Sequence, residues 1–125
     1  MKDEANVFKL LGEPTRLRLA ILLALKGETC VCKLAQALDE PDFKISKHLG
    51  GLRAAGLVKT RREGIWIYYR LSDTGAPFWK RLMGCLKDCF GDHPVTVGDL
   101  TRLDRASCGP DTVGGKCTQG KRGRA

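Results

Sequence analysis

Three features are missing from this sequence of 125 residues: an apolar run that can cross a bilayer, an apolar segment near its start, and the residue pattern of an active site. The longest apolar stretch covers residues 19–25, whereas a membrane-spanning helix needs about 20 apolar residues. Met1 is followed directly by charged residues, so no secretory signal sequence is expected. The chain has only two histidines, and it has neither a nucleophile beside a base nor a glycine-rich phosphate loop, which argues against an enzyme. We therefore expect a cytoplasmic protein without a membrane partner.

Negative charge is also scarce, because 14 acidic residues stand against 22 lysines and arginines and leave a formal net charge of +8. A basic balance of this kind favours a polyanionic partner such as nucleic acid. The length corresponds to one small domain, whose core is thin enough that dimerisation is a natural way to bury more apolar surface.

Cysteine, by contrast, is plentiful, with six residues in a short chain. In a reducing cytoplasm, clustered cysteines are more often metal ligands or redox thiols than disulfides. Cys30 and Cys32 stand one residue apart in the segment ETCVCKL, residues 28–34, and soft thiolates bind soft metals and metalloids. This pair is therefore the first candidate for a ligand site.

The spacing of apolar residues predicts a mainly helical domain with one β-hairpin. Pro14 suits the first turn of a helix, and the all-round apolar run after it predicts a buried helix. Pro41 marks a fresh helix start, and Gly56 stands where a helix C-terminus favours positive φ. Two β-rich runs separated by Glu63 and Gly64 predict a hairpin. The expected elements are helices over 4–12, 14–27, 30–38, 41–55 and 76–90, with strands over 57–62 and 65–71.

After Leu103 the composition changes to glycine and basic residues with almost no apolar ones. We expect residues 1–103 to form the folded DNA-binding and dimerisation domain, and 104–125 to form a disordered, basic, glycine-rich tail. The predicted order ααααββα is that of a winged helix-turn-helix, a mainly α domain in which the β-hairpin is called the wing.

The predicted helix over 41–55 is the recognition helix of this arrangement and is expected in the major groove of DNA. Its apolar stripe consists of Ile45, Leu49 and Leu52, and its outer face is polar. Lysine can address guanine acceptors, and basic residues of the wing can follow the phosphate backbone. His48 on that outer face can equally well pack or cap instead of contacting a base. The candidate DNA-binding residues are Asp42, Lys44, Ser46, Lys47, His48 and Arg53 on the helix, with Lys59, Arg61 and Arg62 on the wing.

Several segments together resemble the ArsR/SmtB family of metalloregulatory repressors. The similarity extends over residues 7–72, and the segments that carry it are 11–19 (LGEPTRLRL), 30–34 (CVCKL), 44–49 (KISKHL), 52–57 (LRAAGL), 62–64 (REG) and 69–71 (YRL). The resemblance implies a homodimeric repressor of a resistance operon that leaves its operator when metal binds. It also implies dimerisation through the first and last helices, and the matching apolar residues are Val7, Leu10 and Leu11 with Phe78, Leu82 and Leu86. Such a two-fold dimer reads an inverted repeat in double-stranded DNA.

Within that family, the Cys-Val-Cys segment resembles the inducer site of arsenic and antimony repressors. Cadmium- and lead-responsive members complete such a site with cysteines from an N-terminal arm, but this chain has no cysteine before Cys30. The resemblance therefore implies trivalent arsenic or antimony as the inducer and no organic cofactor. The third cysteine of the best-known arsenic branch would stand where this sequence has Ala35.

The spacing of the two cysteines suggests how a ligand acts. Residues i and i+2 of an α-helix lie about 200° apart around its axis. If Cys30 and Cys32 both belong to the helix over 30–38, one ion can bind both thiolates only by distorting its first turn. A distorted helix supports the recognition helix less well, so we expect ligand binding to lower the affinity for DNA.

The third ligand and the inducer stay open at this point. Cys85 and Cys89 are spaced i, i+4, so their sulfurs share one face of the helix over 76–90 and form a second candidate site. Cys108 and Cys117 in the tail, or a small exogenous thiol, are further candidates for the third ligand. The alternatives to an arsenic- or antimony-responsive repressor are the same fold sensing a divalent soft metal or a methylated arsenical through Cys85 and Cys89, and a repressor switched by thiol oxidation.

Overall fold

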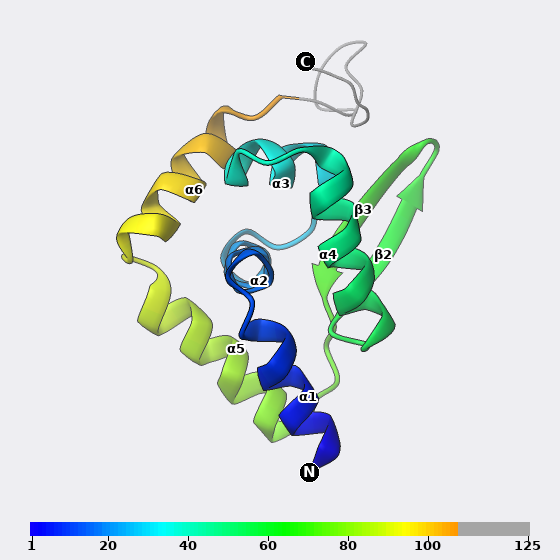
Figure 1. Cartoon of the computed structure of the whole chain (residues 1–125), viewed down its shortest axis with the longest axis vertical. Helices are drawn as coiled ribbons and strands as arrows, with labels where there is room; N and C mark the ends of the chain where they lie inside the picture. The colour runs from blue at the N-terminus through cyan, green and yellow to red at the C-terminus, as the bar shows by residue number, and fades with distance from the viewer. Residues whose placement is uncertain (108–125) are drawn as a thin grey trace.

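The computed structural model describes residues 1–107, in which helices surround one central helix and a small sheet lies at one side (Figure 1). Its elements are α1 (Lys2–Leu11), α2 (Pro14–Lys26), β1 (Thr29–Cys30), α3 (Val31–Leu38), α4 (Asp42–Ala54), β2 (Val58–Glu63), β3 (Trp66–Leu71), α5 (Pro77–Phe90) and α6 (Pro94–Arg105). The predicted winged helix-turn-helix is confirmed, and β1 and α6 are additions that apolar periodicity did not predict. None of the helices in this described part is long and apolar enough to cross a bilayer.

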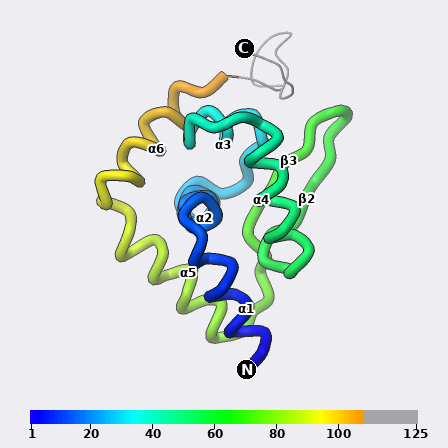
Figure 2. Tube along the Cα trace, viewed as in Figure 1, coloured from blue at the N-terminus to red at the C-terminus, as the bar shows by residue number. Residues whose placement is uncertain are grey.

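Helix α2 forms the centre of the domain, and Figure 2 shows the other helices around it. It begins at Pro14, whose missing N–H needs no partner there, and the side chain of Glu13 accepts a hydrogen bond from Arg16 N at 2.9 Å. Leu19 and Leu22 are almost completely buried, as the all-round apolar run predicted. Because α2 contacts α1, α4, α5, α6 and β3, most of the core is built on it.

Helices α3 and α4 form the helix-turn-helix. α3 is capped at its C-terminus by Asp39, which adopts a left-handed φ of 55°. The following N–H, that of Glu40, donates to the carbonyl of Ala35 at 3.0 Å. Pro41 then adopts an extended conformation directly before α4. The predicted apolar stripe of α4 is buried, so the opposite face of the helix is left exposed.

Three antiparallel strands form the sheet, in the order β1-β3-β2. Strands β2 and β3 are the predicted hairpin, joined by a two-residue turn in which Gly64 has a φ of 64°. Strand β1 has only two residues, and it pairs Thr29 with Tyr69 and Cys30 with Tyr68. A strand this short carries no alternating pattern, which is why periodicity could not reveal it. Its presence makes the segment before α3 part of the wing sheet.

Helix α6 packs against α3 on the side away from the wing (Figure 1). Its Asp99 is only 1% exposed and accepts hydrogen bonds from Arg18 of α2, from Nε at 3.0 Å and from Nη2 at 2.7 Å. Arg102 Nη2 donates to the same carboxylate at 2.7 Å, and Arg102 Nε donates to the carbonyl of Ala37 at 2.7 Å. This network fastens α6 to both α2 and the end of α3.

The sequence did not reveal α6 because its first half is a poor helix former. The segment after Pro94 combines β-branched residues with Gly98, and both lower helix propensity. Packing against α2 and α3 outweighs that preference, with Leu103 buried in the core. Since α6 continues to Arg105, the folded domain extends past the predicted boundary at residue 103. The remainder of the predicted tail from residue 108 onward lies outside the described residues.

We expect Asp99→Asn to lower the free energy of unfolding by about 2 kcal/mol, because it removes the charge that holds two guanidinium groups and leaves a buried amide in its place. The exposed pair of Lys26 with Asp104 (3.4 Å) offers a matched control on the same helix, since exposed ion pairs contribute at most about 1 kcal/mol. Urea unfolding followed by circular dichroism measures both variants. Equal losses for Asp99→Asn and Asp104→Asn would contradict the anchoring role of Asp99.

Candidate DNA-binding face and cysteine site

Most of the predicted DNA contacts are exposed on α4 and the wing: Ser46, Lys47, Arg53, Lys59, Arg61 and Arg62. The other three, Asp42, Lys44 and His48, are half-buried. Lys44 Nζ lies 3.1 Å from Glu40 Oε1, so its charge is partly compensated within the protein. In the first half of α4, the predicted contacts that remain exposed are therefore Ser46 and Lys47.

His48 contacts Arg16 of α2 instead of standing clear of the protein. Its Nδ1 lies 3.4 Å from Arg16 Nη1, and Arg16 Nε donates to the carbonyl of Leu10 at 2.7 Å. Arg16 thereby connects α1, α2 and α4. Of the two roles open to His48, packing and base contact, this geometry favours packing.

Phe43 is the residue of the recognition helix that the sequence analysis missed. Its side chain is 76% exposed in the first turn of α4. Phe43 stands two residues before the buried Ile45 and therefore about 200° from it around the helix axis. The sequence alone places Phe43 opposite the apolar stripe, so this position could have been identified from the sequence as an exposed apolar residue.

Arg61 is bound within the protein. Its guanidinium donates to Glu28 Oε1 from Nε at 2.9 Å and from Nη2 at 2.7 Å, and it also pairs with Glu63. It lies over the ring of Tyr68, 4.7 Å from the ring centroid. Hydrogen bonding to the two carboxylates raises the pKa of Arg61, and the bond with Arg61 lowers the pKa of Glu28. Arg61 is therefore charge-compensated, and it joins the wing to the segment just before β1.

Lys59 and Arg62 differ from Arg61 in their surroundings. They are three residues apart on β2, so they lie on opposite faces of the hairpin, with Lys59 opposite Arg70 and Arg62 opposite Ile67. Both side chains are exposed, and no ion pair within residues 1–107 compensates either charge. These two residues are the better placed of the predicted wing contacts.

Cys30 and Cys32 are brought together in a small buried cluster with Tyr68, where they are 2% and 5% exposed. They do not share a helix as expected. Cys30 ends β1 and caps α3 in an extended conformation, with φ −85° and ψ 159°, and only Cys32 belongs to the first turn of α3. The two cysteines therefore do not lie about 200° apart on one helix, and the predicted distortion of a shared first turn is wrong. The pair instead joins a strand of the wing sheet to the first helix of the helix-turn-helix.

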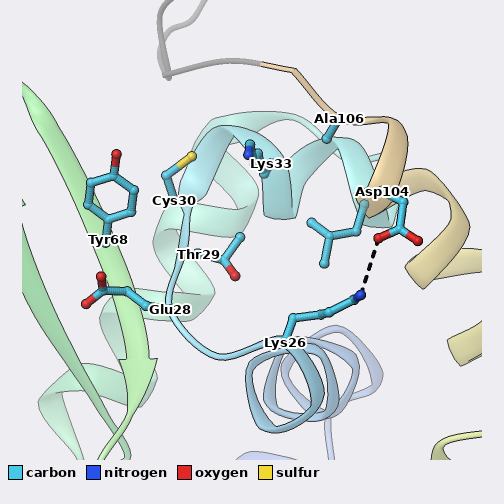
Figure 3. A pocket seen from close by; sticks show the side chains of 9 residues that line it. Lys26, Glu28, Thr29, Cys30, Lys33, Tyr68, Asp104 and Ala106 are labelled. Atoms are coloured by element: carbon cyan, nitrogen blue, oxygen red, sulfur yellow. Dashed lines mark ion pairs between the residues drawn. The ribbon is translucent and has the colours of Figure 1, made fainter. Parts of the chain in front are cut away.

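A pocket of about 290 Å³ opens beside Cys30 (Figure 3). Cys30 lies between Tyr68 and Lys33 in this view, and Ala106 at the end of α6 lines the same pocket. Lys26 and Asp104 pair at 3.4 Å across its far side. The pocket therefore reaches Cys30, but not Cys32, from the surface between α3, α6 and the wing.

Sulfur chemistry differs among the described cysteines. Cys32 is disulfide-bonded, and Gln36 Nε2 lies 3.1 Å from its sulfur. Ala35 is buried in the apolar core. Within residues 1–107, no group of three His, Cys, Asp or Glu side chains is arranged to hold a metal ion. The described residues thus place two of the predicted sulfurs together, and Cys32 must be reduced before it can bind an ion as a thiolate.

Cys85 and Cys89 form the second predicted pair, and the structure brings them together on the exposed face of α5. Both are free thiols with their sulfurs 3.7 Å apart, and the hydrogen bond with Cys85 raises the pKa of the Cys89 thiol. α5 and α3 lie on different sides of α2 (Figure 1), so the two pairs form separate candidate sites. Cys108 and Cys117 lie outside the described residues.

Comparison with known sequences identifies relatives of this chain. Residues 13–60, from α2 into β2, match the model of the arsR family of bacterial regulatory proteins. The arsenic resistance transcriptional regulator ArsR1 of Pseudomonas putida is 52% identical over 65 residues, which are 52% of this chain and 51% of that protein. The arsenical resistance operon repressor of Escherichia coli is 50% identical over 67 residues, which are 54% of this chain and 57% of that protein. The chain thus spans little more than half the length of these curated relatives.

Solved structures agree with the sequence matches. The transcriptional repressor BigR from Xylella fastidiosa is 34% identical, with a TM-score of 0.63 over 74% of this chain and 88% of that one. Reduced HlyU from Vibrio cholerae is 29% identical, with a TM-score of 0.63 over 71% of this chain and 90% of that one. Taken with the family match across the helix-turn-helix, these likenesses show that the chain belongs to the arsR family of bacterial regulatory proteins, which are transcriptional regulators and not enzymes.

Proposed function

We propose that this protein is a transcriptional repressor that binds operator DNA as a homodimer and is released when trivalent arsenic or antimony binds the thiolates of Cys30 and Cys32. The observation that carries the proposal is the position of these two buried cysteines, one in β1 and one in α3, so that each belongs to an element of the DNA-binding unit. The names of the Pseudomonas putida and Escherichia coli relatives, which refer to arsenic and arsenical resistance, support a metalloid as the inducer.

The donor set fits a soft ion. Two sulfurs lie in a buried cluster beside an aromatic ring, and soft thiolates prefer soft metals to hard cations such as magnesium. The two carboxylates that line the pocket beside Cys30 are already engaged, since Asp104 pairs with Lys26 and Glu28 with Arg61. A bound trivalent metalloid supplies strong bonds to sulfur, and the reduced forms of Cys30 and Cys32 would hold it.

The proposed response depends on the connection between β1 and α3. Cys30 is paired with Tyr68 of the wing, while Cys32 lies in the first turn of α3, which packs against α4. Holding both sulfurs on one ion fixes the angle between β1 and α3, and any angle other than that of the DNA-bound form lowers operator affinity. A coupling free energy of about 3 kcal/mol corresponds to an affinity loss of about 100-fold.

Several exposed side chains support DNA binding through α4 and the wing. Residues early in a recognition helix reach base edges, which is the position of Phe43, Ser46 and Lys47. Phenylalanine can contact the methyl group of thymine, and lysine can address guanine acceptors. Lys59 and Arg62 on the wing, with Arg53 at the end of α4, are placed for phosphates, which position the protein without reading sequence.

Apolar side chains on α1 and α5 support a two-fold dimer. Phe8 of α1 is 57% exposed and meets Phe78 of α5 edge to face, with ring centroids 5.7 Å apart. Leu10 and Leu82 are only partly buried, whereas the other members of the predicted set, Val7, Leu11 and Leu86, lie in the core of the protomer. Covering this surface with a second copy would bury it and would place the two recognition helices about 34 Å apart, for an inverted repeat.

Two alternatives have support of their own. The sulfurs of Cys85 and Cys89, 3.7 Å apart on an exposed face, are suited to a divalent soft metal or a methylated arsenical. The disulfide at Cys32 favours a repressor switched by thiol oxidation. Because these alternatives use different sulfurs or a different reagent, single substitutions separate them.

We expect Arg62→Ala to weaken operator binding and to lower the salt dependence by about 0.9 for each protomer, as the loss of one phosphate contact requires. Arg61→Ala is the matched control, because the charge of Arg61 is compensated by Glu28 and Glu63. Fluorescence anisotropy at several salt concentrations, on an operator selected from random DNA, measures both slopes. A larger change for Arg61→Ala than for Arg62→Ala would refute the assignment of the wing contacts.

We expect Phe43→Ala to lower operator affinity by about 1 kcal/mol or more, in the range of a base contact. If the ring contacts a thymine methyl, replacing that thymine with uracil weakens wild-type binding but leaves Phe43→Ala unaffected. Scanning uracil through one half-site identifies the position. An operator in which no uracil substitution discriminates between the two proteins would rule out this contact.

We expect Cys30→Ser and Cys32→Ser to bind operator DNA normally but to lose release by arsenite, because serine keeps the size of the side chain and lacks a soft donor. Cys85→Ser is the control and should be released like the wild type. Release is followed by anisotropy with protein reduced by a phosphine, so that no external thiol competes for the metalloid. Normal release of Cys30→Ser and Cys32→Ser with loss in Cys85→Ser would favour the α5 site, and release by peroxide without metal would favour the redox switch.

A further inference from the structure

We infer that Arg61 is a positioning residue through which the cysteine site acts on the wing, an inference that rests on the proposed function. Arg61 belongs to β2, the strand that also carries the proposed phosphate contact Arg62. It contacts Tyr68, which packs against the two cysteines, and Glu28, which stands two residues before Cys30. A metalloid at the cysteines disturbs these contacts and thereby moves the strand that meets DNA.

Three residues form a row across the sheet, one on each strand. The register pairs Cys30 with Tyr68 and Tyr68 with Arg61. Side chains that stand directly opposite one another in an antiparallel sheet lie on the same face and interact. Accordingly, Tyr68 packs against the cysteine cluster, and the guanidinium of Arg61 lies 4.7 Å from the centroid of the Tyr68 ring. A continuous line of side-chain contacts thus leads from the cysteine cluster to β2.

Glu28 provides a second connection between Arg61 and the segment that carries Cys30. Two N–H groups of Arg61, Nε and Nη2, donate to Glu28 Oε1 at 2.9 and 2.7 Å. Figure 3 shows the Glu28 carboxylate and the Tyr68 ring on the wing side of Cys30. An isolated exposed ion pair contributes little, but here two hydrogen bonds and a cation–π contact hold the same guanidinium. Arg61 therefore ties β2 to the backbone just before β1.

Arg61 and Arg62 lie on opposite faces of the hairpin, because successive side chains of a strand alternate between its faces. Arg61 lies on the face of the cysteine cluster, opposite Tyr68, whereas Arg62 stands opposite Ile67 and is exposed. The two residues share one stretch of backbone. A displacement of Arg61 therefore also displaces the neighbouring phosphate contact.

An ion bound by the two sulfurs has to be accommodated beside the ring of Tyr68. Protein interiors are close-packed, so atoms added to a buried cluster displace a neighbour. Tyr68 packs against this cluster while being only partly buried itself, and moving its ring weakens the contact with Arg61. The ion then favours the displaced wing and DNA the undisplaced one, so each ligand lowers the affinity for the other.

Glu28 and Glu63 provide a matched pair of substitutions. Both carboxylates bind Arg61, and replacing either with glutamine removes one negative charge near the wing. Glu63 lies on β2 itself, two residues from Arg61, so its bond cannot tie the wing to another segment. The measured quantity is the release factor, which is the operator Kd at saturating arsenite divided by the Kd without arsenite. Fluorescence anisotropy measures it on the full-length protein reduced by a phosphine.

We expect a release factor of about 100 in the wild type and in Glu63→Gln, and of about 10 or less in Glu28→Gln and Arg61→Ala. Arg61→Lys should give an intermediate value, because lysine keeps the charge but lacks the planar guanidinium. A substitution that only changes the electrostatic attraction to DNA alters both operator affinities alike and leaves the release factor unchanged. Arsenite titrations with and without operator DNA should return the same factor, as linkage requires.

Glu28→Gln and Arg61→Ala break one contact from its two sides, so either variant tests it if the other does not fold. A wild-type release factor in the folded variants, or an equal loss in Glu63→Gln, would overturn the role of Arg61 and leave the two-cysteine site intact. Normal release of Cys30→Ser and Cys32→Ser by arsenite, or no release of the wild type, would overturn the proposed function itself and this inference with it.

Discussion

The pairing of β1 with β3 is the constraint on which the functional arrangement depends. Only Thr29 and Cys30 form this strand, yet they place the segment before α3 in the same sheet as the wing. Arg61 reinforces the connection, because it bonds to Glu28 just before β1 and covers Tyr68 of β3. The wing and the helix-turn-helix therefore meet at the cysteine cluster, and the backbone at Cys30 cannot shift without moving one of them.

Helix α3 is held at both ends by different forces. At its start, Cys30 caps it from the sheet, and at its end Arg102 donates to the carbonyl of Ala37. That arginine is held in turn by the buried carboxylate of Asp99, which also binds Arg18 of the central helix. A buried carboxylate needs such partners, since an unpaired charge in the interior is costly. A displacement of the first turn of α3 therefore occurs in a helix whose other end is held in place. That held end lies next to the turn that leads into α4.

The whole chain has a net charge of +8, but the basic residues expected to face DNA are not equally available to phosphates. Arg61 and Lys44 belong to the regions expected to contact DNA, but carboxylates of the protein compensate them. Lys47 and Arg62 are exposed with no ion pair inside residues 1–107. A basic residue in a DNA-binding element can thus either stabilise the fold or contact DNA. It stabilises the fold when a carboxylate of the protein compensates its charge. Arg61 serves the fold, because it holds the wing against the segment that carries Cys30.

Local patterns in the sequence determined the winged helix-turn-helix. The stripe of Ile45, Leu49 and Leu52, the breaks at prolines and glycines, and the hairpin turn at Gly64 all depend on near neighbours in the chain, and the structure agrees with them. The close approach of Cys85 and Cys89 was predictable for the same reason, because an i, i+4 spacing on a helix needs no tertiary information.

Only the tertiary structure decided where Cys30 lies. Its two-residue strand exists because β3 offers a free edge, and β3 is remote in sequence, so no local pattern reports it. Helix α6 likewise forms against its own propensity because α2 and α3 provide a surface and a buried ion network for it. Because of contacts between distant segments, the two cysteines that were expected on one helix instead connect the wing to α3. The end of α6 lies beside them.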